Sequence, residues 1–324
     1  MVKISDVAKL ANVSQATVSR VLNQPELVKE ETKVKVQEAI ESLKYERNVI
    51  AKNLVTGKTG IISLYIPEDI VLSQNFVTKL IIGITEFLSE NEYSFIIRRN
   101  LQKLVNCDGY IAAGLTDLQT AEIRNITKKI NKPLVISGST DIEDISFVDV
   151  NNIIGAEKAI DFLIENGHKN IGIVLNDENK LYVKDRLQGY KNALFRNGIE
   201  FNESNVFVTE NSVKGGKEIT KEVIKRDDLT AFFCITDRIA KGLIYTLENN
   251  GKKVPEDLSI IGYDGIEQEL NTGIELSTIR QPVDEIANLI SQKIIKEINK
   301  NDNTVINEYL IPTLVKGKTV KNIK

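Results

Sequence analysis

The chain has 324 residues, of which 42% are hydrophobic and 27% are charged. This composition is typical of a folded globular protein and excludes a collagen-like or disordered chain, and the length favours two or three domains. The net charge of −3 excludes a general polycation, yet residues 1–60 carry 10 basic and 7 acidic side chains. A basic segment on an acidic body suggests that one end of the molecule binds a polyanion.

The cysteines and the apolar runs predict where the protein resides. Cys107 and Cys234 lie in apolar, strand-like segments, and no Cys-x-x-Cys motif is present to bind zinc. We therefore expect buried free thiols in a reducing compartment. The first residues, VKISDVAK, are polar rather than an apolar signal core, and no apolar run approaches the ~18 residues of a membrane span. These features predict a cytoplasmic protein that makes no contact with a membrane.

Residues 1–46 are expected to form short helices only. Ser5 is expected to cap a first helix, and Ser14 is expected to cap a second helix after a tight turn. A third helix, at about residues 30–44, has one apolar stripe for a small core. Two capped helices joined by a tight turn are typical of a helix-turn-helix domain, although these residues alone fit a generic helical hairpin equally well.

The rest of the chain has a different pattern of apolar and polar residues. Residues 47–60 read as a polar connector that ends in glycine. Apolar runs typical of strands buried on both faces then alternate with amphipathic stretches, which predicts α/β architecture with doubly wound parallel sheets. Some 260 residues are too many for one open sheet, so two lobes are expected, with a ligand site in the cleft at the carboxyl ends of their strands. The expected strands are 61–66, 95–97, 109–113, 133–137, 170–175, 231–235 and 258–262, and the expected helices are 76–90, 117–130, 154–166, 183–197, 214–226, 237–250 and 283–299.

Signatures of catalysis are missing from the sequence. No Gly-x-Gly-x-x-Gly follows an expected strand, and Gly57-Lys58-Thr59 lacks the first glycine of a P-loop because that position is Lys52. His168 is the only histidine, so no histidine triad or histidine metal cluster can assemble, and a structural role is expected for it. We therefore expect no enzyme activity, no cofactor and no metal.

Several segments, in order along the chain, share one family resemblance. They start with Ile4–Asn23 and continue through Val28, Tyr45, Asn48 and Leu54. Later segments are Gly155, Gly167-His168-Lys169-Asn170-Ile171, Arg186-Leu187-Gln188-Gly189, Pro255–Asp264 and Thr278-Ile279-Arg280-Gln281-Pro282. These segments resemble the lactose-repressor (LacI/GalR) family of bacterial transcription regulators. The resemblance implies a helix-turn-helix domain followed by a two-lobed body like that of periplasmic binding proteins.

The resemblance also implies which residues contact double-stranded operator DNA. Gln15, Ala16 and Arg20 match the base-reading positions of the recognition helix, and Leu54 matches an apolar wedge that enters the minor groove. Without the family, Leu54 would be an ordinary core or linker leucine. Phosphate-contacting positions are matched by Ser5, Ser14, Thr17, Asn23, Tyr45 and Asn48, with helix capping as the alternative for Ser5 and Ser14.

In the body, Arg186 and Asp264 match positions that hold a small-molecule effector. A guanidinium donates hydrogen bonds and a carboxylate accepts them, so together they can clamp a polyol; a plain ion pair in the cleft is the alternative. Thr236 and the segment 73–76, with Asn75 and Phe76, are weaker candidates at equivalent strand ends. Arg98 and Arg99 follow another strand and suggest either an anionic effector such as a sugar phosphate or solvated surface side chains.

Two departures from the family stand out. Arg47 replaces the usual proline at the start of the hinge, which removes a preset backbone angle. Only residues 101–106 separate Asn100 from Cys107, where the family inserts a whole helix in the first lobe. The expected domains are a helix-turn-helix domain (1–46), a hinge (47–60), a first lobe (61–148 with 281–301) and a second lobe (149–280 with 302–324).

Together these features predict a sequence-specific repressor of the LacI/GalR type. It is expected to bind a palindromic operator as a homodimer, under the control of a sugar or sugar-phosphate effector. A cytoplasmic sugar-binding protein without a regulatory role is the alternative; an α/β enzyme is a third possibility that lacks a supporting motif.

Overall fold

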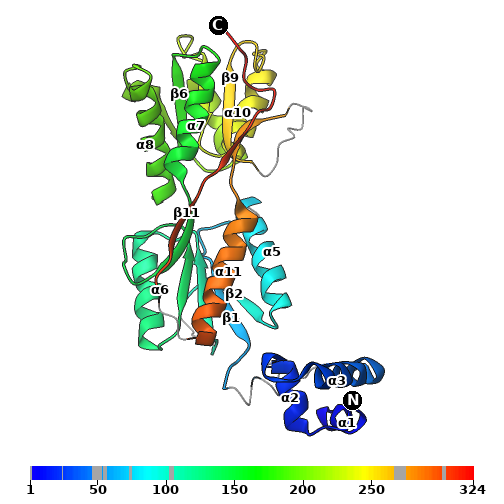
Figure 1. Cartoon of the computed structure of the whole chain (residues 1–324). Coiled ribbons are helices and arrows are strands. Elements are labelled where there is room, and N and C mark those ends of the chain that lie inside the picture. The colour runs from blue at the N-terminus through cyan, green and yellow to red at the C-terminus, as the bar shows by residue number, and fades with distance from the viewer. Residues whose placement is uncertain are drawn as a thin grey trace. The chain divides into compact units, whose positions relative to one another are not determined.

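The computed structural model describes residues 2–23, 25–45, 53, 57–72, 75–101, 106–265, 275–300 and 304–324, without the side chains of Asn23, Asn75 and Lys300. The chain divides into two compact units, Met1–Thr59 and Gly60–Lys324 (Figure 1). Arg47, Asn48 and Leu54, which carry the expected hinge contacts, lie outside the described residues.

The first unit is a small helical domain. Its apolar core is formed mainly by Val7, Ala8, Ala11, Val18, Val36 and Ala39, which are all buried. Asn12 takes up a left-handed backbone conformation (φ 51°) in the turn between the first two helices, a conformation that asparagine tolerates better than most residues. The helices are α1 (Ile4–Leu10), α2 (Gln15–Asn23) and α3 (Glu30–Leu43), with a 3₁₀ turn η1 (Pro25–Leu27).

The two expected helix caps have different outcomes. The Ser14 hydroxyl accepts a hydrogen bond from the Thr17 amide at 3.0 Å, so the prediction that Ser14 caps α2 is confirmed. The prediction that Ser5 caps α1 is wrong, because α1 begins at Ile4 and Lys3 occupies the cap position. The Asp6 carboxylate accepts a hydrogen bond from the Lys3 amide at 2.8 Å, so an acidic side chain in the first turn takes over the role.

In the described part of the second unit, the strands form two six-stranded sheets, one in each lobe. All neighbouring strands of the first lobe are parallel, in the order β11-β5-β4-β3-β1-β2. Buried side chains of helices α5 and α11 pack on one face of this sheet, while α6 contributes Ile123 to the core on the other face. The elements are β1 (Ile61–Tyr65), α5 (Asn75–Glu90), β2 (Ser94–Arg98), β3 (Gly109–Ala113), α6 (Asp117–Lys129), β4 (Leu134–Ser137), β5 (Ser146–Val150), α11 (Val283–Lys300) and β11 (Asn307–Leu310).

The second lobe repeats this strand order as β12-β10-β9-β8-β6-β7, with only β12 antiparallel to its neighbour. Helices α7 and α8 cover one face and α9 and α10 cover the other, so the expected doubly wound architecture is confirmed. The elements are α7 (Asn152–Glu165), β6 (Ile171–Asn176), α8 (Leu181–Arg196), η2 (Glu203–Asn205), β7 (Val206–Thr209), α9 (Val213–Val223), β8 (Ala231–Cys234), α10 (Asp237–Asn249), β9 (Ser259–Asp264), β10 (Ser277–Arg280) and β12 (Thr313–Val315).

The chain passes between the lobes three times, after β5, β10 and β11 (Figure 1). The lobe boundaries differ from expectation in two places. The strand β5 extends the first lobe to Val150 rather than to residue 148. The strand β11 pairs with β5 in the first lobe, whereas the sequence predicts that residues 302–324 belong to the second. The β11 segment combines polar Asn307 and Glu308 with exposed Tyr309, so it lacks the apolar run that identifies a buried strand.

Three smaller expectations concern buried residues and membrane contact. Cys107 and Cys234 are buried free thiols, as predicted. His168 is buried and its ring nitrogens lie 2.9 Å from the Thr230 hydroxyl and 3.1 Å from the Lys321 carbonyl oxygen, so it ties a loop to the C-terminal segment. Among the described helices, none has the length and apolar character needed to cross a bilayer.

Candidate functional site

Helix α2 presents a compact exposed face. Gln15, Ala16 and Arg20 are exposed, whereas Val18 on the opposite side is fully buried in the core of the first unit. Residues one turn apart lie on the same side of a helix, so Ala16 and Arg20 are neighbours. The structure therefore brings the three expected base-reading side chains onto one accessible surface.

The expected phosphate-contacting residues lie in different settings. Ser14 and Thr17 share a hydrogen bond of 2.8 Å between their hydroxyls at the start of α2. Ser5 lies in the first turn of α1, while the Tyr45 ring packs against the core just after α3. Asn23 is the last residue of α2. The start of α2 thus offers hydroxyl groups and the positive end of a helix dipole to an anion.

A cavity of the second unit lies between the two lobes, at the carboxyl ends of their strands. Its two walls differ in chemistry. The first lobe contributes a largely apolar wall that includes Ile66, Ile70, Phe76, Val77 and Leu115, with Ser137, Ser139 and Asp149 as polar additions. The second lobe contributes a polar wall that includes Glu178, Lys180, Tyr182, Arg186, Asn211, Thr236, Asp237, Arg238 and Asp264.

Arg186 forms the centre of the polar wall and is only 3% exposed. Its Nε donates to the Asn152 side chain at 3.0 Å, and its Nη1 donates to the Ile235 carbonyl. The guanidinium carbon lies 3.5 Å from the centroid of the Tyr263 ring and 4.7 Å from that of Tyr182. The guanidinium is therefore held in one orientation by hydrogen bonds and by aromatic faces.

Two glycines explain how the sequence folds around Arg186. A Cβ on Gly189 would lie 2.3 Å from the Ile153 carbonyl oxygen, and a Cβ on Gly155 would lie 2.3 Å from the Tyr263 hydroxyl. These glycines therefore allow α8 to approach α7 and the Tyr263 ring to lie beside α7. These two close contacts position Asn152 of α7 and the Tyr263 ring, which hold the Arg186 side chain.

Asp264 lies beside Arg186 on the polar wall. Its Oδ1 lies 3.8 Å from Arg186 Nη1 and accepts a hydrogen bond from Gln281 Nε2 at 2.8 Å. Asp264 has a positive φ of 134°, which side chains other than glycine rarely adopt, and such strained residues cluster at functional sites. The neighbouring Asp237 accepts from the Gly265 amide at 2.8 Å and from the Thr278 hydroxyl at 2.6 Å, so it anchors the turn after Asp264.

Burial changes the proton affinity of these carboxyl groups. Loss of hydration raises the pKa of Asp264, and Arg186 and Gln281 offset part of that rise. The pKa of Asp237 rises because of burial and because of repulsion from Asp264. Burial also raises the pKa of Asp149 on the first-lobe side. A pocket of this kind favours hydrogen-bond donors such as hydroxyl groups at the carboxylates.

Four of the five expected effector residues line one cavity. Arg186, Asp264, Thr236 and Phe76 meet there, and the side chain of Asn75 lies outside the described part of the chain. Thr236 also bonds Asn211 at 3.1 Å and caps α10, so it has a structural role as well.

Arg99 has a different role from the suggested anion site. Its Nη2 donates to the carbonyl oxygens of Glu68 at 2.9 Å and Ile70. Neither Arg98 nor Arg99 is among the described lining residues of the cavity. The guanidinium of Arg99 instead braces the loop after β1.

Sequence reasoning missed several polar lining residues, including Glu178, Lys180 and Asn211. Glu178 and Lys180 follow β6 at its carboxyl end, which is the position where ligands bind in open parallel sheets. That signal was available in the sequence. Asn211 follows β7, a four-residue edge strand that the apolar pattern did not reveal.

Comparisons with known proteins place the chain in a family. A model described as bacterial regulatory proteins of the lacI family matches residues 3–48, and a periplasmic binding protein-like domain matches residues 160–320. The chain is 33% identical to the HTH-type transcriptional regulator YvdE of Bacillus subtilis, over 97% of this chain and 98% of that protein. The chain belongs to the lacI family of bacterial regulatory proteins.

Other members of the lacI family extend the likeness over the whole chain. The ribose operon repressor of Haemophilus influenzae is 30% identical and covers 100% of both chains. A lacI-family regulator of Enterococcus faecium, solved with bound ribose, is 25% identical with a TM-score of 0.73, over 82% of this chain and 100% of that chain. This protein is accordingly a DNA-binding transcription regulator with the two-lobed lacI-type fold.

Proposed function

We propose that this regulator represses transcription by binding a palindromic operator as a homodimer, and that a small sugar bound between the lobes changes its affinity for DNA. The observation that carries the proposal is the pocket that joins Arg186 and Asp264 to an apolar wall. A sugar ring has apolar C–H faces and a rim of hydroxyl groups, so it matches both walls. Because its target is the chromosome, we place the protein in the cytoplasm.

On the DNA side, we assign base reading to the exposed face of α2. Arg20 can bond the O6 and N7 of guanine, Gln15 can bond adenine, and the methyl of Ala16 can lie against thymine. We assign phosphate contacts to Ser5, Ser14, Thr17, Asn23, Tyr45 and Asn48, and minor-groove insertion to Leu54. A single domain of about 45 residues offers little surface, so two copies in a dimer are needed for a selective site.

On the effector side, Arg186 donates to the sugar and Asp264 accepts from it, with Phe76 and Thr236 beside them; Asn75, at the start of α5, stays a candidate. The described lining residues include four carboxylates against three cations. Lys180 and Arg186 already have protein acceptors. This balance favours a neutral sugar over a sugar phosphate. Two relatives support a sugar, the ribose operon repressor and the ribose-bound regulator.

The alternative is a sugar-binding protein without a regulatory role. Such a protein has no use for the polar, exposed face of α2, so that face favours the regulator. The proposal gives the pocket a binding role and no catalytic step.

The DNA-binding part is tested with duplexes from the region upstream of the gene, by fluorescence anisotropy at several salt concentrations. Arg20→Ala is expected to cost roughly 1–3 kcal/mol and to relax the preference at one base pair per half-site. Lys9→Ala removes a charge from α1 of the same domain and serves as the control, since it is expected to leave sequence preference unchanged. Binding without sequence preference in the unmodified protein contradicts the proposal.

A further inference from the structure

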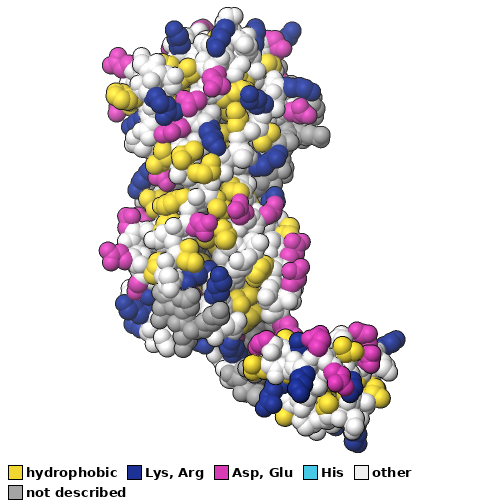
Figure 2. Space-filling view, viewed as in Figure 1, with side chains coloured by type: hydrophobic (Ala, Val, Ile, Leu, Met, Phe, Trp, Pro, Cys, Tyr) yellow, Lys and Arg dark blue, Asp and Glu magenta, His cyan; other side chains and the backbone are white. Residues whose placement is uncertain are grey.

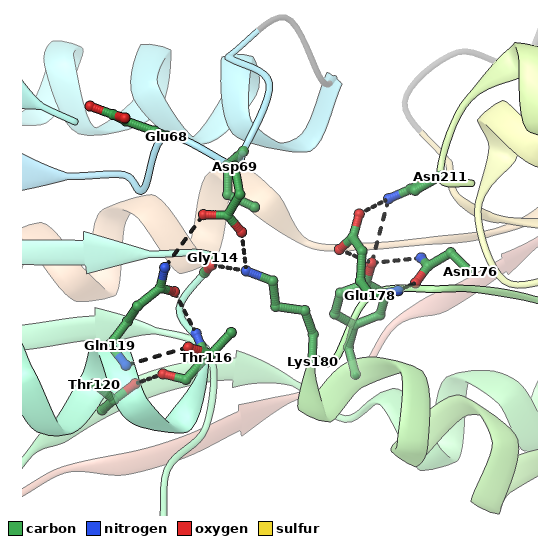
Figure 3. A network of polar contacts seen from close by, with 12 residues as sticks. Glu68, Asp69, Gly114, Thr116, Gln119, Thr120, Asn176, Glu178, Lys180 and Asn211 are labelled. Atoms are coloured by element: carbon green, nitrogen blue, oxygen red, sulfur yellow. Dashed lines mark hydrogen bonds and ion pairs between the residues drawn. The ribbon is translucent and has the colours of Figure 1, made fainter. Parts of the chain in front are cut away.

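Lys180 links the two lobes across the edge of the pocket. It precedes α8 in the second lobe, and its Nζ lies 3.1 Å from Asp69 Oδ2 and donates to the Gly114 carbonyl, both in the first lobe (Figure 3). The side chain is only 6% exposed. A lysine side chain that is buried along its length and bonded to two acceptors is fixed in place. This contact is therefore a defined bond between lobes.

The first-lobe end of this link is itself anchored. The other Asp69 oxygen accepts from Gln119 Nε2 at 3.4 Å (Figure 3). Gln119 belongs to the capping box of α6, in which its Oε1 accepts from the Thr116 amide at 2.9 Å. Asp69 is thus tied to the start of α6. Movement of the first lobe carries Asp69 with it.

Lys180 also separates the pocket from solvent. Lys180 and Gly114 line the cavity, whereas Asp69 does not line it and its side chain is 52% exposed. The ammonium group therefore lies between the cavity on one side and the solvent-facing carboxylate on the other. Partial burial alone raises the pKa of Asp69, but the hydrogen bond and charge of Lys180 outweigh that effect and lower it.

The charge of Lys180 is already neutralised by Asp69, so this lysine is poorly suited to hold an anionic ligand. On the second-lobe side the nearby polar groups bond among themselves. The Tyr182 hydroxyl donates to Glu178 at 2.8 Å. Asn211 also donates to Glu178, at 2.9 Å (Figure 3). What distinguishes Lys180 from these neighbours is that it donates to acceptors in the other lobe.

We propose that Lys180 is a gate residue, which joins the lobes through Asp69 and Gly114 and closes one side of the effector pocket. This inference rests on the proposed function in taking the pocket as the effector site. The bond exists only when the lobes are close, so it favours the closed arrangement. A ligand that needs the closed arrangement then binds more tightly and leaves more slowly.

The first test measures lobe separation in the full chain without added sugar. Spin labels are placed at the exposed positions Glu122 on α6 and Lys184 on α8 through cysteine substitutions, while Cys107 and Cys234 are buried. Lys180→Met and Asp69→Asn are each expected to lengthen and broaden the distance distribution. The double variant is expected to match the single ones, because all remove one interaction.

Asp69→Asn keeps this test decisive if Lys180→Met folds poorly, since Asp69 is half exposed. Lys128→Met is the matched control, because Lys128 pairs with Asp144 inside the first lobe at 3.4 Å. It is expected to leave the distance unchanged. A wild-type distance distribution in Asp69→Asn overturns the proposal.

The second test uses ribose and measures its dissociation rate by stopped flow. Lys180→Met and Asp69→Asn are each expected to release ribose about fivefold faster. The effect is modest because one partner of the ion pair is half exposed to solvent. An unchanged rate in Asp69→Asn contradicts the gate. Failure of the wild-type protein to bind ribose contradicts the proposed effector, while the distance measurement still decides the role of Lys180.

Discussion

The two lobes have the same six-strand order but are covered differently. The second lobe has a pair of helices on each face of its sheet, whereas the first has α5 and α11 on one face and α6 on the other. In the first lobe, β2 leads to β3 through residues 99–108, and the described part of this link contains no helix. Ile96 of β2 is 36% exposed. The pocket wall of the first lobe is present despite this short link. Ile66 and Gly114 directly follow β1 and β3, Ser137 ends β4, and all three line the cavity.

The comparison extends to the site, where the first lobe gives an apolar wall and the second a polar one. Figure 2 shows acidic and basic side chains interspersed over the visible face of the second unit, so this division of chemistry is a property of the pocket rather than of the exterior. Among the described residues, the first lobe thus has less helical cover than the second and still supplies one wall of the site. The lobes are expected to respond differently to substitution.

The largest effect is expected from the close helix contact of the second lobe. In Gly189→Val the new side chain would meet the Ile153 carbonyl, so α8 must move away from α7. We expect a loss of at least about 3 kcal/mol in the free energy of unfolding, measured with urea. Lys184→Val puts the same side chain on an exposed position of α8 and is expected to cost less than about 1 kcal/mol. Equal losses would refute the close-approach role of Gly189.

The two walls are compared directly by weakening each in turn. Arg186→Met removes the central donor of the polar wall, and we expect ribose affinity to fall at least about 100-fold. Phe76→Ala trims the apolar wall, and roughly a tenfold loss is expected from the lost contact area. Calorimetry measures both, with thermal unfolding as a check on folding. A larger loss from Phe76→Ala than from Arg186→Met would reverse the assignment of the walls.

The smallest expected effect is a pH dependence of stability that originates in the second lobe. Burial and the nearby Asp264 raise the pKa of Asp237 to about 7. The folded state therefore keeps a proton on Asp237 that the unfolded chain releases near pH 4. The free energy of unfolding consequently falls as the pH rises from about 4 through the raised pKa of Asp237. We expect Asp237→Asn to remove at least about 1 kcal/mol of the loss between about pH 5 and pH 8.

Urea unfolding at several pH values checks this expectation. The control is Asp227→Asn, because that side chain is 87% exposed. Parallel pH profiles for Asp237→Asn and the wild type would show that Asp237 does not carry the effect.

Much of the fold could be predicted from the sequence, because most central strands are apolar runs and the helices between them are amphipathic. The expected strands omit β5 and β10, which mix polar residues with apolar ones. They also omit β7, β11 and β12, which are short edge strands with exposed positions. Arg186 and Asp264 were found through a motif, and Gly155, Gly189 and Tyr263 of the same motifs now have packing roles around them. The place of Lys180 after β6 is a local signal for a pocket residue, but its contact with the first lobe depends on how two sheets meet and leaves no local pattern.

The central claim is that binding between the lobes controls binding to DNA, and Asp264→Ala tests it most directly. Operator affinity is measured by anisotropy with and without ribose for the wild type and the variant. In the wild type, ribose is expected to change operator affinity. In Asp264→Ala, operator affinity without ribose is expected to stay within about twofold of the wild type, and the response to ribose is expected to vanish. A normal ribose response in Asp264→Ala would contradict the assignment of the pocket.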